Sequence, residues 1–191
     1  YLGTGGPQED TDVIPITVVP VTFADSPTWT MFPAALDTSF DGDGVQTLSV
    51  SAGVDYIHEM KLLANGKILA VGAVNDHYGV MRFNADLTLD TTFGTNGVTE
   101  TDLGTSTSDG ASRHAFTLEV DRNDRIVVGG DGYIVRYTTN GQLDTTFGNG
   151  GSVRNSFVEN ITDIAIQPDG KLIAHGGEEV SNNGRGFRTS R

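Results

Sequence analysis

The stretch LDTTFG at residues 89–94 occurs again unchanged at residues 143–148, and a related stretch, LDTSFDGDG, occupies residues 36–44. The three copies begin at Leu36, Leu89 and Leu143, which lie 53 and then 54 residues apart. Self-similarity at a fixed period of 20–50 residues or slightly more is the pattern of a repeat architecture. The stretch therefore predicts a structure that is built from three copies of one unit.

Each copy is followed by the same short segments in the same order, of which examples are VQTLSV from residue 45, IHEMKLLANGK from 57, ILAVGA from 68 and YGVMRFN from 78. The segments are rich in Val, Ile, Thr and Tyr and are bounded by Gly, Asn and Asp, which is the pattern of strands. Their turns, such as ANGK and PDGK, allow the positive φ angles of a two-residue hairpin. No window has the apolar spacing of a helix.

Four strands that recur with this period predict the blades of a β-propeller, or a related array of small antiparallel sheets. We predict an all-β fold, a β-propeller-like array of three four-stranded antiparallel blades. The repeats span residues 36–88, 89–142 and 143–191, the third being truncated, and residues 1–35 form an N-terminal leader and extended strand. Because propellers ordinarily have at least four blades, we expect further blades of a longer chain, completion by a partner copy, or an open array.

The segments LDTTFGTNGV, QPDGKLIAHGG and YGVMRFNADLTLDTTFG resemble the delta-sixty repeat, which occurs in tandem in large secreted or surface proteins of bacteria. The resemblance covers residues 36–191. It implies propeller blades and a bacterial extracellular or cell-surface location. It implies no activity, because the family has no general assigned one.

The repeated motif is interpreted as scaffold rather than as a repeated catalytic acid. Its leucine and phenylalanine are expected to fill the core between adjacent blades, and its aspartate to fix the turn by a local hydrogen bond. Arg82, Arg136 and Arg191 recur at the end of the last strand and are expected to form interblade ion pairs with an aspartate. The structural repeat residues are Leu36, Asp37, Phe40, Leu89, Asp90, Phe93, Leu143, Asp144 and Phe147.

Two sets of residues raise the question of a metal. Asp41 and Asp43 stand two residues apart beside glycines, as in calcium loops, but no glutamate follows at calcium-loop spacing. We interpret them as a solvated turn, with a weak calcium site as the alternative. The four histidines, His58, His77, His114 and His175, are not spaced for joint ligation on one element. No cofactor is expected apart from calcium.

The segment IPITVVPVTF at residues 14–23 combines high β propensity with two prolines, which restrict a strand to an edge position. We predict that it forms an extended strand that docks on an exposed blade edge, in this molecule or in another copy. The residues of this predicted assembly strand are Ile14, Ile16, Val18, Val21 and Phe23.

Composition excludes several classes of partner. With 25 acidic and 12 basic residues, the formal net charge is −13, which repels nucleic acid and anionic lipid. No apolar run reaches the ~18 residues that a membrane span requires. The chain has no cysteine, so it has neither disulfides nor thiolate metal sites. Together with the Gly-, Thr- and Asn-rich composition, this favours an extracellular protein.

Two hypotheses about function remain. The first, which we favour, is a non-catalytic extracellular structural module for assembly, adhesion or polymer binding, with carbohydrate as one conceivable polymer and strand exchange as the route to self-association. The second is an extracellular propeller enzyme that acts on sugars, of the lactonase or lyase type. The sequence contains no nucleophile elbow, phosphate loop or zinc-protease motif. We therefore expect the protein not to be an enzyme.

Overall fold

The structure is a computed structural model of the chain, and it describes residues 45–53, 55–104, 113–156, 158, 160–180 and 184–190. The chain divides into two compact units, Tyr1–Thr47 and Leu48–Arg191, and all strands described below belong to the second. The described residues form eleven strands and no helix. Within them, no helix has the length and apolar character of a membrane span.

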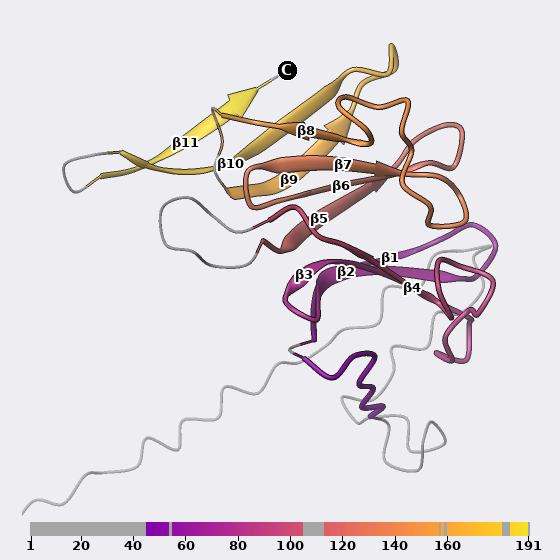
Figure 1. Ribbon diagram of the computed structural model, residues 1–191. Helices are drawn as coiled ribbons and strands as arrows, with labels where there is room; N and C mark the ends of the chain where they lie inside the picture. Colours follow the sequence, from indigo (N-terminus) through magenta and orange to yellow (C-terminus); the bar gives the residue numbers. More distant parts are fainter. Residues whose placement is uncertain are drawn as a thin grey trace, which may run out of the picture. The chain divides into compact units, whose positions relative to one another are not determined.

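The strands form three antiparallel sheets, which we call blades 1 to 3 (Figure 1). Blade 1 has the order β1 (Tyr56–Leu62), β2 (Ile68–Val74), β3 (His77–Phe83), β4 (Val98–Thr101). Blade 2 has the order β5 (Ala115–Val120), β6 (Ile126–Gly130), β7 (Tyr133–Tyr137), β8 (Ser152–Arg154). Blade 3 contains β9 (Asn160–Ile166), β10 (Leu172–Val180) and β11 (Gly184–Ser190), with β10 in the middle. The predicted all-β array of antiparallel blades is confirmed, and the third sheet has three strands.

The sheets are offset from the sequence repeats by one strand. The fourth strand of blade 1, β4, follows the LDTTFG copy that starts at Leu89, and it pairs with the preceding strand β3 through Val80↔Thr99. In blade 2, β8 likewise follows the copy that starts at Leu143 and pairs with β7. The copies at Leu89 and Leu143 therefore each close the sheet formed by the strands before them.

The turns differ in detail from the sequence expectation. Between β2 and β3, Asn75 and Asp76 have φ angles of 52° and 62°, so this turn is a two-residue hairpin with both residues left-handed. In the predicted ANGK turn only Gly66 is left-handed, with φ of 80°. Its amide donates to the carbonyl of Leu63 at 2.9 Å. This hairpin therefore has a longer loop with one left-handed residue, because a single glycine after a right-handed turn also restores the strand twist.

The same β-bulge occurs in the first strand of all three blades. The register shifts at Ile57/Glu59 in β1, at Ala115/Thr117 in β5, and opposite His175/Gly176 in blade 3. The extra residues are His58, Phe116 and Thr162. A bulge bends the strand and increases its twist. The three blades thus share a local distortion as well as a pairing order.

A glycine lies opposite each bulge, and in blade 3 it is Gly176. A Cβ atom at Gly176 would lie 1.8 Å from the carbonyl oxygen of Asn160, whereas a Cβ atom at the neighbouring Gly177 meets nothing within 4 Å. We expect Gly176→Ala to lower the free energy of unfolding by about 2 kcal/mol through overpacking against backbone. Gly177→Ala, the matched control, should change it by less than about 0.5 kcal/mol. Urea unfolding of both variants measures the difference, and equal costs would contradict this account of the bulge.

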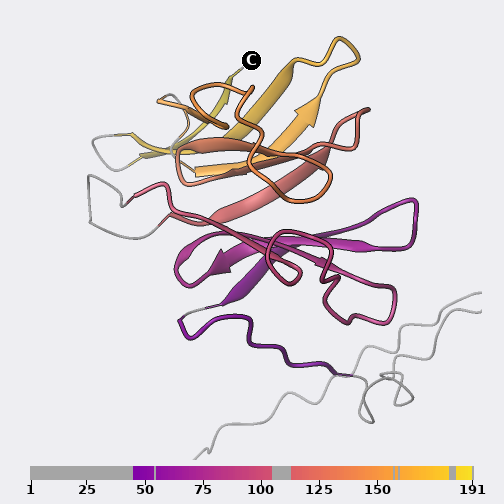
Figure 2. The same ribbon diagram turned by 45° about the vertical axis from the view of Figure 1, so that its right-hand side comes forward.

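The blades lie face to face in sequence order, as the two views in Figures 1 and 2 show. One apolar cluster joins blades 1 and 2, and a second joins blades 2 and 3. The first includes Leu69 and Val80 of blade 1 with Leu118 and Val135 of blade 2. The second includes Ile134 of blade 2 with Ile161 and Ile164 of blade 3, among others. These two clusters are therefore made between sheets, and a third, formed by Ala70, Val74, Met81 and Phe83, lies on the other face of blade 1.

Candidate functional site: the repeat clusters between the blades

The aspartate of the repeated motif lies at the centre of a polar cluster in blade 1. Its Oδ2 atom accepts hydrogen bonds from Arg82 Nε at 2.6 Å and Lys67 Nζ at 2.8 Å. Its Oδ1 atom accepts from the Thr92 hydroxyl at 2.7 Å and from the Thr92 amide at 3.2 Å. We call Arg82, Asp90, Thr92 and Phe93 the first repeat cluster. Both carboxylate oxygens of Asp90 are satisfied by these donors.

The electrostatics of the first repeat cluster keep its carboxylate ionised. Burial of the Asp90 side chain raises its pKa, but hydrogen bonds from Lys67, Thr92 and Arg82 outweigh that effect. The net result is a pKa well below the ordinary value of an aspartate. Asp90 therefore acts as a fixed negative charge between two cationic side chains and not as a proton donor or acceptor near neutral pH.

The same cluster also contacts the next blade. The guanidinium carbon of Arg82 lies 4.7 Å from the centroid of the Phe93 ring, and its Nη1 donates to the carbonyl of Thr139 at 2.7 Å. The Gly94 amide donates to the carbonyl of Asn140 at 2.8 Å. Phe93 is fully buried, and a Cβ at Gly141 would lie 2.6–2.8 Å from its ring atoms. The turn of blade 2 therefore lies directly against the first repeat cluster.

The interblade ion pair expected for Arg82 is wrong in one respect. The ion pair with Asp90 lies within blade 1, since Arg82 is on β3 and Asp90 follows the turn after that strand. The contact between blades is made instead by Nη1 of Arg82, which donates to the backbone carbonyl of Thr139. A planar group with five donors can serve both acceptors at once.

Blade 2 repeats the arrangement in what we call the second repeat cluster: Arg136, Asp144, Thr146 and Phe147. Arg136 Nε lies 2.7 Å from Asp144 Oδ2, and its guanidinium carbon lies 4.6 Å from the Phe147 ring centroid. The Thr146 hydroxyl donates to Asp144 at 2.6 Å. Arg191, the third expected arginine, lies outside the described residues. Lys171 of blade 3 matches Lys67 in sequence, but its ammonium group contacts Asp169 of its own turn.

The leucine of the motif does not fill the core between blades as expected. Leu143 is 37% exposed. Its side chain packs against Gly151 of its own motif, where a Cβ atom would lie 2.4 Å from Leu143 Cγ. Leu89 stands in the same relation to Gly97, 2.8 Å from its Cβ position. The leucine folds back over its own turn because a glycine with positive φ leaves room there.

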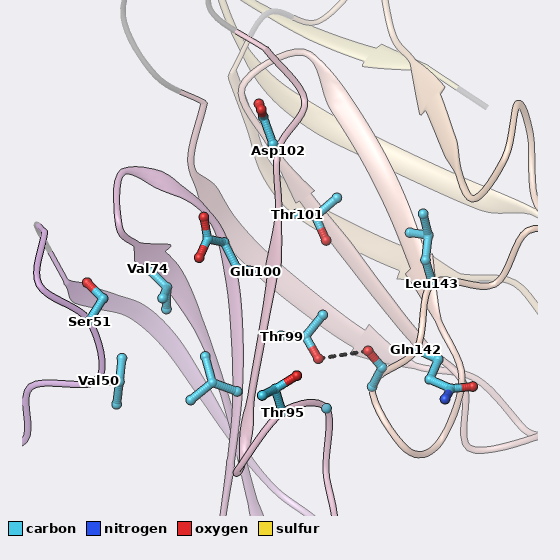
Figure 3. Close-up of a pocket in the computed structure, with 13 residues that line it drawn as sticks. Val50, Ser51, Val74, Thr95, Thr99, Glu100, Thr101, Asp102, Gln142 and Leu143 are labelled. Carbon is cyan, nitrogen blue, oxygen red and sulfur yellow. Dashed lines mark hydrogen bonds between the residues drawn. The ribbon is translucent and has the colours of Figure 1, made fainter.

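A groove of about 770 Å³ surrounds the edge strand β4 (Figure 3). Val74 and Glu100 lie on one side of the strand in this view, and Thr101 and Leu143 on the other. A carboxylate oxygen of Glu100 lies 2.5 Å from Nδ1 of His77, the first residue of β3. The groove offers carboxylate and hydroxyl groups at its surface. It follows an edge and does not form an enclosed cavity.

A second group, which the sequence did not predict, combines aromatic and histidine side chains near the bulges of β1 and β5. Ring centroids lie 4.9 Å apart for Tyr56 and His58, 5.3 Å for Tyr56 and His114, and 4.8 Å for His58 and Phe116. All three pairs are edge-to-face. Burial raises the pKa of the Tyr56 hydroxyl, with a further rise from nearby aspartates. The group joins blades 1 and 2 by aromatic packing.

Several predicted residues lie outside the part of the chain that the structure describes. These are Leu36, Asp37 and Phe40 of the first motif copy, Asp41 and Asp43 of the calcium candidate, and the assembly-strand residues Ile14, Ile16, Val18, Val21 and Phe23. Among the described residues, no group of three or more His, Asp or Glu side chains is placed to hold a metal ion.

Comparison with known families agrees with the blade geometry. A family model described as "Domain of unknown function (DUF5122) beta-propeller" matches residues 63–93 and 122–147. Both segments run from the first turn of a blade through its second and third strands to the phenylalanine of its repeat cluster. No curated protein and no solved structure matched the chain. Two segments of the chain are thus similar to a β-propeller repeat family, for which the model's description gives no function.

Proposed function

We propose that the chain is a non-catalytic structural module of a bacterial extracellular or surface protein, which associates with other copies of itself through the open faces of its blades. The support begins with the repeated residues. Arg82 forms an ion pair with Asp90, packs on the ring of Phe93, and donates a hydrogen bond to the turn of blade 2. A motif that recurs in blades 1 and 2 and whose polar and aromatic groups are taken up by such contacts serves the scaffold. The extracellular location is supported by sequence composition and by the resemblance stated above.

The observation that carries self-association is the open face of blade 1, which we define as Ile57, Met60 and Leu62. Counted from the bulge, Met60 is equivalent to Leu118 in β5 and Ile164 in β9. Leu118 and Ile164 are 1% and 2% exposed because a preceding blade covers them, whereas Met60 is 50% exposed. Leu62 is 72% exposed. Apolar side chains gathered on one open face mark an interaction surface.

A second open position lies at the edge of blade 3. In blades 1 and 2 the fourth strand comes from the repeat that follows, as β4 and β8. Within the described residues, β11 has β10 as its only strand partner. An unpaired edge is a template for another strand. The predicted assembly strand at residues 14–23 is our candidate for this position, donated by a neighbouring copy, and its support is its sequence.

Self-association can be tested by measuring mass against concentration with analytical ultracentrifugation. We expect the chain to associate at micromolar concentration and Met60→Asp to weaken association at least about tenfold, because a buried unpaired carboxylate opposes packing. Asn123→Asp, at an exposed position in the turn between β5 and β6, is the matched control and should associate like the original chain. Deletion of residues 1–24 removes the predicted assembly strand, so association that persists in the deleted chain comes from packing of the open face rather than from strand exchange. A chain that stays monomeric throughout, or a Met60→Asp variant that associates unchanged, would refute the proposal.

A further inference from the structure

A pocket of about 530 Å³ lies between blades 2 and 3 beside the second repeat cluster. Ile134, Phe147 and Val153 line it from blade 2. Leu172, Ala174 and Ser190 line it from blade 3. The pocket is mostly apolar and belongs to neither the groove around β4 nor the open face of blade 1.

The equivalent space between blades 1 and 2 is filled by the side chain of Tyr137. The pairs Ala174↔Ser190 and Val128↔Val135 hold the same place in blades 3 and 2. In blade 2, two residues after Val135, Tyr137 is fully buried in the cluster that joins blades 1 and 2. Its hydroxyl lies 2.8 Å from the Thr101 hydroxyl oxygen. An aromatic side chain at the end of the third strand therefore fills this space.

The turn after Tyr137 completes the contact at the first repeat cluster. The carbonyls of Thr139 and Asn140 accept hydrogen bonds from Arg82 and from the Gly94 amide. Gly141 lies so close to the ring of Phe93 that a Cβ atom would clash with it. The occupant thus has a defined chemistry: an aromatic residue, two turn carbonyls and a glycine four residues after the aromatic.

The second repeat cluster has the same donors in place. Arg136 and Gly148 are the equivalents of Arg82 and Gly94. Within the described part of the chain, no backbone carbonyl accepts from Arg136 Nη1 or from the Gly148 amide. Phe147 is only partly buried, whereas Phe93 is fully covered. Donors and ring are therefore arranged as in blade 1 but without the turn that satisfies them there.

We propose that this pocket is a docking site for an aromatic-x-x-x-Gly strand and turn, the chemistry of a further repeat of this type, lying in line with β11. The aromatic ring enters the apolar pocket between Ile134 and Ala174. The carbonyls two and three residues later accept from Arg136 and Gly148, and the glycine lies against Phe147. This inference rests on the proposed structural function, and it names the segment that the second repeat cluster recognises.

The test extends the full chain after Arg191 by Tyr-Thr-Thr-Asn-Gly-Gln, the sequence of residues 137–142. Tethering presents the segment at high effective concentration. We expect the midpoint of thermal unfolding to rise by about 5 °C, as burial of one aromatic side chain implies for a domain of this size. Two further extensions serve as controls: one has serine in place of the tyrosine, and the other has leucine in place of the glycine. Both should raise the midpoint by less than about 2 °C.

The variant Phe147→Ala tests the other side of the contact. In this background the tyrosine and serine extensions should give the same midpoint, because the surface that receives the turn is lost. Equal midpoints for all three extensions on the original chain would overturn the inference. That result would leave the proposed function standing, since the mass of the unextended chain tests self-association separately.

Discussion

Phe93→Ala is expected to lower the free energy of unfolding by about 4 kcal/mol, as large-to-small substitutions of fully buried aromatic residues do. Phe93 is 0% exposed and contacts the Arg82 guanidinium on one side and the turn at Gly141 on the other. Alanine would leave a cavity at the junction of two blades that the rigid backbone turn cannot fill. Urea unfolding followed by circular dichroism measures this change.

The chain supplies its own control in Phe147, the same residue of the next repeat. Phe147 makes the equivalent contact with Arg136 at 4.6 Å but is only partly buried. We expect Phe147→Ala to cost about 1–2 kcal/mol, since less area returns to water. Equal costs for the two variants would show that the turn of blade 2 adds nothing to the burial of Phe93. A negligible cost for Phe93→Ala would contradict the scaffold interpretation of the motif.

The blade architecture could be predicted from sequence because its signals are local. Alternating apolar residues and glycine-containing turns define strands over a few residues, and their recurrence from Leu36 to Leu143 adds the period. The offset between repeat and sheet could not be predicted. It depends on whether the strand at Val98 pairs with the strand before it or with the strand after it. The sequence offers a β-forming segment on both sides, and the structure shows pairing with the preceding strand β3.

The contacts of the repeat clusters were predictable only in part. A recurring arginine and aspartate indicate an ion pair, and Arg82 and Asp90 form one. The acceptor in the next blade is the backbone carbonyl of Thr139. Every residue has a backbone carbonyl, so the amino-acid sequence does not indicate which one accepts the hydrogen bond. Likewise, the exposure of Leu143 follows from the space above Gly151, which depends on a φ angle of 108°.

The group formed by Tyr56, His58, His114 and Phe116 could not be predicted, because a one-residue bulge changes which residues of the two blades are equivalent. His58 lies near the start of the first strand of blade 1, and His114 directly precedes the first strand of blade 2. The bulges make His58 equivalent to Phe116 instead, because each is the extra residue of its strand. A strand has a side-chain period of two, so one inserted residue reverses which face a side chain occupies. The contact between His58 and Phe116 required the register to be known.

Asp90→Asn is expected to lower the free energy of unfolding by about 2–3 kcal/mol at neutral pH. Removing one partner of a buried ion pair leaves the other charges uncompensated. Here Arg82 Nε and Lys67 Nζ both lie within 3 Å of Asp90 Oδ2, at 2.6 and 2.8 Å. The estimate lies below the usual range for a fully buried pair because the Lys67 side chain is partly exposed to water. Asp144→Asn is the matched variant in blade 2, where the second cation, Arg125, is 3.8 Å away, and it should cost less.

The same substitution should change how stability depends on pH. Hydrogen bonds from Lys67, Thr92 and Arg82 outweigh burial and hold the pKa of Asp90 well below its ordinary value. A carboxyl group of this kind contributes its full stabilisation above its unfolded-state pKa, about 3.9, and loses it as the pH falls from there towards the folded-state pKa. The free energy of unfolding of the original chain should therefore decrease below about pH 4, and that of Asp90→Asn should decrease less steeply over the same interval. Urea titrations at several pH values between neutrality and pH 2.5 give both slopes. Parallel slopes would mean that the ionised carboxylate at the centre of the first repeat cluster does not stabilise the junction between blades.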